Sequence, residues 1–186
     1  MLLYPFRSSR VLRFLPLLPT MVLPLFAADG GATVQPVDRV GWQADYASRF
    51  EQVRHAFLPA RDKVITVFVN PAAATVTTLE QLPYPAGAVI VFEWADPQKD
   101  ATGKPHQDAD GKVLKGPITR IDVMRREPGY GADYGKDRAG EWEFASYFPD
   151  GRSMALPDGA VACARCHKGA GSERDFVFAS RFPKKN

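Results

Sequence analysis

The stretch AVIVFEW, residues 88–94, decides the fold that the sequence predicts. Its β-branched and aromatic side chains are typical of a β-strand. Alternation separates them into two faces: Ile90, Phe92 and Trp94 on one, and Val89, Val91 and Glu93 on the other. The segments on either side of this strand decide what kind of sheet it joins.

Three further segments predict strands: KVITVFV at 63–69, PITRIDVMR at 117–125 and EWEFASYF at 141–148. The polar segment 96–116 is full of turn-forming residues and predicts a long hairpin connection. Because the links are hairpin-like and long crossover helices are lacking, we expect antiparallel pairing. The predicted fold class is α+β, with a predominantly antiparallel β-sheet.

Helices complete the predicted fold at both ends of the sheet. Apolar residues recur at three- and four-residue steps within 42–58, which predicts an N-terminal helix ended by Pro59. His55 lies off that apolar stripe and is expected in solvent. Short helical stretches are also expected at 72–82 and at 159–168, near the C-terminus.

Residues 1–27 have the layout of a secretory signal peptide. Three arginines precede an uncharged apolar stretch, 14–26, which is too short to span a bilayer as a mature helix. Cleavage after Ala27 would put Leu25 where a small residue is usual, so an uncleaved N-terminal anchor is the alternative. We predict that 28–186 form one domain, exported to the periplasm.

The leader also carries the excess charge of the chain. The full sequence has 24 Lys and Arg against 21 Asp and Glu, and residues 1–27 hold three arginines and no acid. Without the leader each sign counts 21, so the formal charge is zero. No basic surplus is left to argue for binding to nucleic acid or to a membrane surface.

Both cysteines of the chain lie in CARCH, residues 163–167, which matches the C-x-x-C-H attachment sequence for c-type haem. Two thiols three residues apart on a helical turn can form thioethers with both vinyl groups of one porphyrin, and the next residue then reaches the iron. We predict one covalently attached haem c, held by Cys163 and Cys166, with His167 on the iron. Haem attachment takes place outside the cytoplasm in bacteria, so the motif and the leader support each other.

Three other interpretations of the two cysteines are weaker. A disulfide would close a very small loop and stabilise little. A thioredoxin-like dithiol usually lies at the start of a helix in a βαβ unit. A zinc site needs about four ligands, and only His55 and His106 remain as further histidines.

The sixth coordination position of the iron separates ligand binding from electron transfer. No Met or His follows His167, so a sixth ligand would come from upstream; the candidates are Met124, Met154, His55 and His106. Met124 is expected in the core, which leaves Met154 as the best of them. We favour a five-coordinate or water-bound iron, which permits ligand binding or catalysis, over a six-coordinate electron carrier.

The chain resembles the cytochrome P-460 family, which includes the cytochromes c′-beta. The resembling features are the strand ending in ITVFVNP, then YPAGAVIVFEW, GEWEFASYF, CARCH and DFVFASRFP, in this order over 65–183. The four-helix cytochromes c′ also carry C-x-x-C-H close to the C-terminus, but strand-like segments precede it here. The resemblance implies a five-coordinate haem with His167 proximal, an open distal pocket and a homodimer.

The resemblance also assigns a place to Phe92. Members that oxidise hydroxylamine have a lysine cross-linked to the haem, and Phe92 takes that place in GAVIVFE. The c′-beta members have distal phenylalanines and bind nitric oxide and carbon monoxide. We therefore expect Phe92 to cap the iron and nitric oxide to be a ligand, with one-electron exchange with a redox partner protein as a further expectation. The alternatives are a hydroxylamine-oxidising enzyme and an ordinary core position for Phe92.

Two further groups of charged residues have open roles. A cation within 61–63 departs from the family pattern; it could contact a haem propionate or a bound anion, or face water. Lys63 could in principle supply a different cross-link. Glu141 and Glu143 could relay protons to a distal ligand, although carboxylates on edge strands are usually solvated.

Overall fold

The structure is a computed structural model that describes residues 38–155 and 158–178. The predicted leader, 1–27, lies outside the described residues. Within the two described ranges, no helix is both long enough and apolar enough to cross a membrane.

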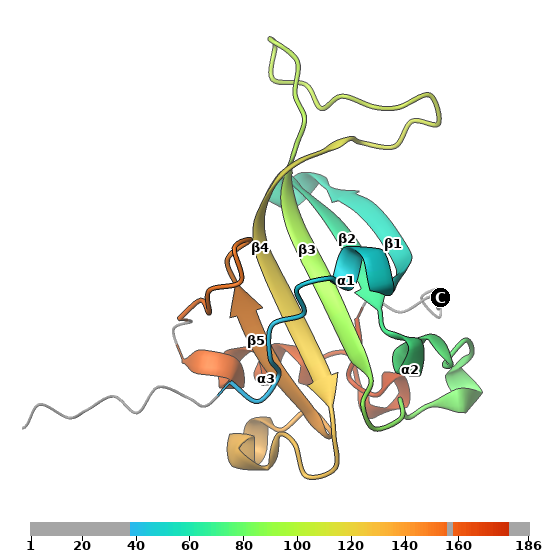
Figure 1. Cartoon of the computed structure of the whole chain (residues 1–186), viewed down its shortest axis with the longest axis vertical. Helices are drawn as coiled ribbons and strands as arrows, with labels where there is room; N and C mark the ends of the chain where they lie inside the picture. The colour runs from blue at the N-terminus through green and yellow to red at the C-terminus, as the bar shows by residue number, and fades with distance from the viewer. Residues whose placement is uncertain (1–37, 156–157, 179–186) are drawn as a thin grey trace, which may run out of the picture. The chain divides into compact units, whose positions relative to one another are not determined.

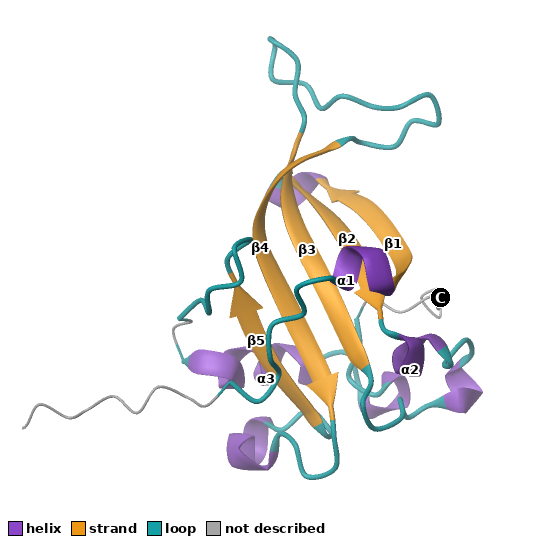
Figure 2. Ribbon diagram, viewed as in Figure 1, coloured by secondary structure: helices purple, strands orange, loops and turns teal. Residues whose placement is uncertain are grey.

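Five strands form one antiparallel sheet in the order of the chain, β1-β2-β3-β4-β5. They are β1 (Glu51–Leu58), β2 (Lys63–Val69), β3 (Val89–Pro97), β4 (Lys115–Arg126) and β5 (Trp142–Tyr147). Figure 2 shows this meander, in which each strand pairs with the next along the chain. The predicted α+β class with an antiparallel sheet is therefore confirmed.

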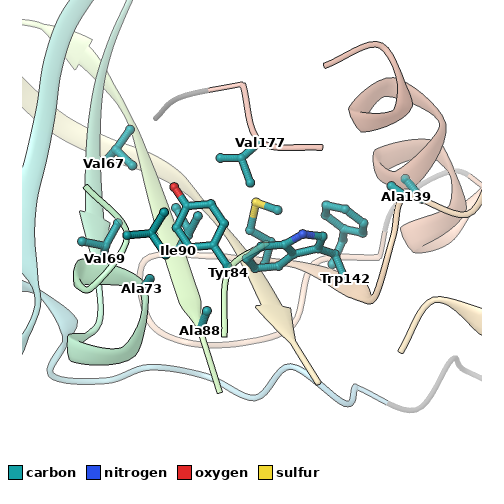
Figure 3. Close-up of a cluster of buried hydrophobic side chains, with 13 residues drawn as sticks. Val67, Val69, Ala73, Tyr84, Ala88, Ile90, Ala139, Trp142 and Val177 are labelled. Atoms are coloured by element: carbon teal, nitrogen blue, oxygen red, sulfur yellow. The ribbon is translucent and has the colours of Figure 1, made fainter. Parts of the chain in front are cut away.

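The two faces of the sheet carry separate hydrophobic clusters. Face A joins Val67, Ile90, Met124 and Phe144 to Ala164 and Val177 near the C-terminus, and Figure 3 shows this cluster around Tyr84 and Trp142. Face B joins Val91, Val123 and Tyr147 to Val40 and Tyr46 from the segment before β1. The alternation predicted for 88–94 is observed, since Ile90 and Val91 belong to opposite faces.

The short helices are divided between these faces. Helix α1 (Tyr46–Arg49) supplies Tyr46 to the face-B cluster, and α3 (Gly159–Lys168) supplies Ala164 to the face-A cluster. In Figure 1, α1 lies in front of the sheet and α3 behind it, beside β5. The stretch predicted as helical at 72–82 is helical only in part: it overlaps helix α2 (Pro71–Ala74) and a 3₁₀ turn, Leu79–Gln81, and 75–78 are not helical.

The predicted helix at 42–58 is wrong over most of its length. Only Tyr46–Arg49 is helical, and Glu51–Leu58 is strand β1, paired with β2. A β-bulge shifts the register between Gln52 and Arg54, so one extra residue interrupts the strand alternation. Phe50, Val53 and Phe57 are spaced by three and four residues in the sequence, like the apolar period of a helix, but Phe50 packs on face B and Val53 on face A.

The long connection between β3 and β4 is the predicted hairpin. Two isolated bridges, Lys99 with Pro105 and Gln107 with Val113, each close a smaller turn within it. Figure 1 shows it extending beyond the end of the sheet. One tip is an Asx turn, in which the Asp108 carboxylate accepts from the backbone N–H groups of Asp110 and Lys112.

Candidate haem site

Helix α3 carries all three residues of the predicted haem motif. It begins after Asp158, whose φ is 59°, and ends at Lys168, as the sequence predicts for 159–168. Its Ala164 is fully buried against face A, and Cys163 packs on the same cluster. The motif is therefore presented toward the face of the sheet that carries Ile90 and Phe92.

The imidazole of His167 is oriented by a backbone carbonyl. Its Nδ1 lies 2.7 Å from the carbonyl oxygen of Phe176, and a carbonyl only accepts, so Nδ1 carries the proton. The other nitrogen, Nε2, then has its lone pair free for a metal. Burial lowers the pKa of His167, which favours the neutral form that binds iron.

A turn with unusual backbone geometry holds that carbonyl in place. Asp175 and Phe176 both have positive φ, 46° and 62°, which costs free energy for residues other than glycine. Three bonds fix Asp175: its carboxylate accepts from the backbone N–H of Tyr84 at 3.0 Å and pairs with Arg126 at 3.5 Å, and its carbonyl accepts from Trp142 Nε1 at 2.9 Å. The position of the Phe176 carbonyl thus depends on residues in four parts of the chain.

The two cysteines have the character expected of haem-attachment thiols. Both are free, with Cys166 exposed and Cys163 partly buried. Burial, with the charge of Asp122 second, raises the pKa of Cys163 to about 11. Among the residues that the structure describes, no three His, Cys, Asp or Glu side chains are grouped to hold a metal ion.

Two aromatic rings lie close to the imidazole of His167. The Phe144 ring on β5 lies 4.8 Å from the ring of His167, and the Phe178 ring lies 5.2 Å away. Phe178 is 47% exposed, the larger exposure of the two exposed large apolar side chains among the described residues. Two free thiols, an available imidazole nitrogen and a partly uncovered aromatic wall fit a covalently attached haem.

Phe92 occupies face A of β3, between two neighbouring strands. In register it pairs with Val67 on β2 and with Asp122 on β4. It packs on the face-A cluster but is only half-buried, whereas the adjacent Val91 is fully buried. Phe92 and Cys163 therefore contact one cluster, and the assignment of Phe92 as the iron cap stays a prediction.

Asp122 is a polar residue beside Phe92 that sequence reasoning missed. Its carboxylate accepts from Trp94 Nε1 at 2.7 Å and from Ser146 Oγ at 2.5 Å, and it pairs with Arg120 at 2.9 Å. Its negative charge adds to the effect of burial in raising the pKa of Cys163, whereas for His167, whose pKa is lowered by burial, it acts in the opposite direction after the Phe176 carbonyl. The alternation of ITRIDVMR places Asp122 on the face of Met124, but only the pairing register brings it beside Phe92.

The candidates for a sixth ligand lie in four different segments of the chain. Met124 is buried in the face-A cluster, as predicted, and His106 is exposed on the hairpin. His55 is not a solvated helix residue: it lies on β1, opposite Thr66, and its Nε2 is 2.9 Å from the Val113 carbonyl. Met154 is half-buried, and its backbone N–H donates to the carbonyl oxygen of Ser146 on β5.

The two carboxylates of β5 have partners of their own. Glu143 is only 7% exposed and accepts from Tyr134 and from the backbone N–H of Gly131, so the expectation that it is solvated is wrong. Glu141 pairs with Arg126 at 2.8 Å. None of these partners is Phe92, Asp122 or His167, and a proton relay through either carboxylate stays a prediction.

Comparison with models of known protein families gives a match over most of the chain. A family model described as Cytochrome P460 matches residues 43–179, well over half of the chain. The matched range includes all five strands and α3. No curated protein matches the chain.

Proposed function

The chain belongs to the cytochrome P460 family, and we propose that it is an exported mono-haem c-type cytochrome whose iron binds a small neutral ligand. The family supports haem and iron binding; the covalent attachment, the ligand and the location are our proposals. Nitric oxide is the ligand that we propose first.

One observation carries the proposal. His167 donates from Nδ1 to the Phe176 carbonyl at 2.7 Å, which leaves Nε2 available for iron, on a helix that also presents two free thiols. We propose that Cys163 and Cys166 hold the porphyrin through thioethers and that His167 is the proximal ligand. The bound haem would supply an iron centre able to bind diatomic molecules.

The sheet side supports an open distal position. Phe92 is the half-buried aromatic residue of face A beside the cluster that contains Cys163. A phenyl ring over the iron would exclude water and would offer no hydrogen bond to a bound ligand. Neutral nitric oxide would lose less binding free energy in such apolar surroundings than a ligand that develops charge when it binds. Asp122 is engaged by Trp94, Ser146 and Arg120, which limits its freedom to donate or accept at that position.

Hydroxylamine oxidation is the second candidate, and the lysines of face A bear on it. The resemblance implies a cross-linking lysine where this chain has Phe92, which has no amine. Lys63 begins β2, and its Nζ pairs with Asp96 at 2.5 Å, four residues along the strands from the pair of Val67 with Phe92. We therefore rank this activity below ligand binding.

Export, electron exchange and dimer formation are further parts of the proposal. The sequence of residues 1–27 supports export, and a covalently attached haem suits the periplasm. One-electron exchange with a partner protein would follow from an iron that changes oxidation state. The homodimer stays a prediction of the resemblance.

Mass spectrometry and optical spectra test the proposal directly. The full chain, matured in a haem-competent bacterial host, should gain the mass of one haem, and Cys163→Ala with Cys166→Ala should gain none. The ferrous protein should show high-spin bands that shift on adding nitric oxide or carbon monoxide. The bare polypeptide mass would contradict haem attachment, and sharp low-spin bands that ignore carbon monoxide would contradict the open position. Met154→Leu should leave the high-spin spectrum unchanged.

A red-shifted Soret band that survives denaturation would instead indicate a cross-linked haem. Lys63→Arg is the variant that would then identify the amine, because arginine keeps the charge and the ion pair with Asp96 but cannot form the same bond. Loss of the shifted band in this variant would favour the hydroxylamine-oxidising alternative.

A further inference from the structure

A small hollow lined by cations opens on the sheet near the predicted distal side. Its volume is about 240 Å³, and it is lined by Arg61, Lys63, Trp94, Thr119 and Arg120. We call it the cationic hollow. It is smaller than the roughly 300–1,000 Å³ of pockets that enclose drug-sized ligands, so it suits a small ion or one substituent of a larger molecule.

The strand register connects the cationic hollow to Phe92. Trp94 follows Phe92 by two residues on the same face of β3, and Arg120 lies opposite Trp94 on β4. Trp94 Nε1 donates to Asp122, which lies opposite Phe92. An occupant of the hollow would therefore lie one row of cross-strand pairs away from the residue that we expect to cap the iron.

The cations of the hollow outnumber the carboxylates that pair with them. Lys63 pairs with Asp96, and Arg120 pairs with Asp122. Within 38–155 and 158–178, the Arg61 guanidinium has no carboxylate partner. Its central carbon lies over the Trp94 ring, 5.4 Å from the ring centroid. The hollow thus has a surplus of one positive charge.

The indole of Trp94 sets the orientation of both guanidinium groups. Arg61 and Arg120 lie over its ring at 5.4 and 4.9 Å from the centroid. Stacking on a ring leaves the N–H edge of a guanidinium free to donate in its own plane. Arg120 Nε is buried and has no hydrogen-bond partner among the described residues, a state that costs free energy unless an acceptor occupies the site.

We propose that the cationic hollow binds a planar oxyanion of the carboxylate type. Arginine donates two parallel N–H groups, which match two oxygen atoms on one carbon or nitrogen atom. Such an anion could be a propionate of the haem itself or a free small anion such as nitrite or formate. The inference rests on the proposed haem site for its position relative to the iron, but not for the chemistry of its own cations.

The first experiment titrates sodium nitrite and sodium formate into the haem-loaded protein and follows the heat of binding. Carbon monoxide saturates the ferrous iron beforehand, so that the iron cannot bind the anion, and sodium chloride keeps the ionic strength constant. A free-anion site gives saturable one-site binding. Arg61→Gln then weakens it at least about tenfold, the loss expected for one charge-assisted hydrogen bond.

Arg152→Gln is the matched control. Arg152 is also an exposed arginine stacked on an aromatic ring, Phe148 at 5.0 Å, but it does not line the hollow. The Arg152→Gln variant should bind nitrite and formate with the same affinity as the parent protein. Because Arg61 has no ion pair, its replacement is not expected to prevent folding.

The second experiment distinguishes the source of the anion. If the parent protein binds no free anion, redox-difference infrared spectra of the carboxylate bands report on the haem propionates. Bands that shift in Arg61→Gln and not in Arg152→Gln assign the hollow to a propionate. Equal behaviour of both variants in both experiments would overturn the proposal. A protein that fails to bind carbon monoxide because its iron is already six-coordinate can still be titrated, so failure of the proposed function is seen separately.

Discussion

The two sides of the candidate haem site are built in different ways. On the proximal side, the three residues of the predicted haem motif lie within five positions of α3, and one backbone carbonyl nine residues after His167 orients the imidazole. On the sheet side, Phe92, Asp122 and Arg120 come from β3 and β4 and meet only through the strand register. The proximal side is local in sequence, and the sheet side depends on tertiary structure.

This difference determines which side tolerates change. The proximal side depends on a carbonyl in a turn with two positive φ values, held by a few buried bonds. A substitution in this turn should displace the Phe176 carbonyl and, with it, the His167 imidazole that donates to it. The sheet side is a row of side chains on paired strands, so one residue can change while the sheet stays in place. The following experiments test this contrast, from the largest expected effect to the smallest.

His167→Gly should produce the largest effect, because it removes the proposed proximal ligand while both thioether positions stay. We expect covalent haem to persist by mass spectrometry and the histidine-ligated spectrum to be lost. Added imidazole should restore the spectrum by entering the space left by the side chain. His106→Gly, an exposed hairpin residue, is the control and should leave the spectrum unchanged. An unaltered spectrum in His167→Gly would refute the assignment.

Asp175→Asn should weaken the proximal side through the turn that holds the Phe176 carbonyl. Asp175 is 6% exposed, and its carboxylate accepts from Tyr84 and pairs with Arg126. We expect a loss of about 1–3 kcal/mol in the free energy of unfolding, measured by urea denaturation. The iron–histidine stretching frequency should also move, since the Phe176 carbonyl that accepts from the imidazole loses part of the support of its turn. A stability loss with an unchanged frequency would limit Asp175 to a structural role.

The same carboxylate predicts a dependence on pH. Burial raises the pKa of Asp175 above its ordinary value, so the folded protein holds this proton more tightly than the unfolded chain. This contribution to stability is present below about pH 4 and is lost as the pH rises through the folded-state pKa. Asp175→Asn should remove that part of the slope. Asp150→Asn should act in the opposite sense, because Arg152 lowers the pKa of Asp150 by a hydrogen bond.

The contrast between the two sides also explains what the sequence could predict. The cysteines, the histidine and the bounds of α3 follow from neighbouring residues, and the structure has α3 at the predicted position. The Phe176 carbonyl was missed because a backbone group has no sequence signature. Asp122 was missed because its neighbours depend on how β4 pairs with β3 and β5.

Strand β1 shows a second limit of sequence reasoning. Its apolar residues have a helical spacing in the sequence, whereas the structure has a bulged strand, and the error also placed His55 in solvent. Pairing with β2 overrides that local pattern. The strands at 63–69 and 88–94 were predictable because their β-branched runs contain no such interruption.

Phe92→Ala should test the sheet side without disturbing the helix side. Removal of the ring should speed association of carbon monoxide with the ferrous protein about tenfold, which equals about 1.4 kcal/mol in the barrier. Phe92→Leu is the milder variant if the alanine variant folds poorly. Phe68→Leu removes an aromatic ring from β2 on face B and should not change the rate. An unchanged association rate in both Phe92 variants would mean that Phe92 is an ordinary core residue.

Asp122→Asn should give the smallest effect, which is electrostatic. Asp122 lies opposite Phe92, the residue that we expect to cap the iron, so its charge would lie beside the proposed distal position. Its removal disfavours the ferric iron, which carries the greater positive charge, and the reduction potential should rise. The expected size is about 1 kcal/mol, or roughly 40 mV for one electron. Ser146→Ala removes a hydrogen-bond donor to the same carboxylate but keeps its charge, and it should shift the potential much less. Equal shifts in the two variants would mean that the hydrogen bond, rather than the charge, links the sheet to the iron.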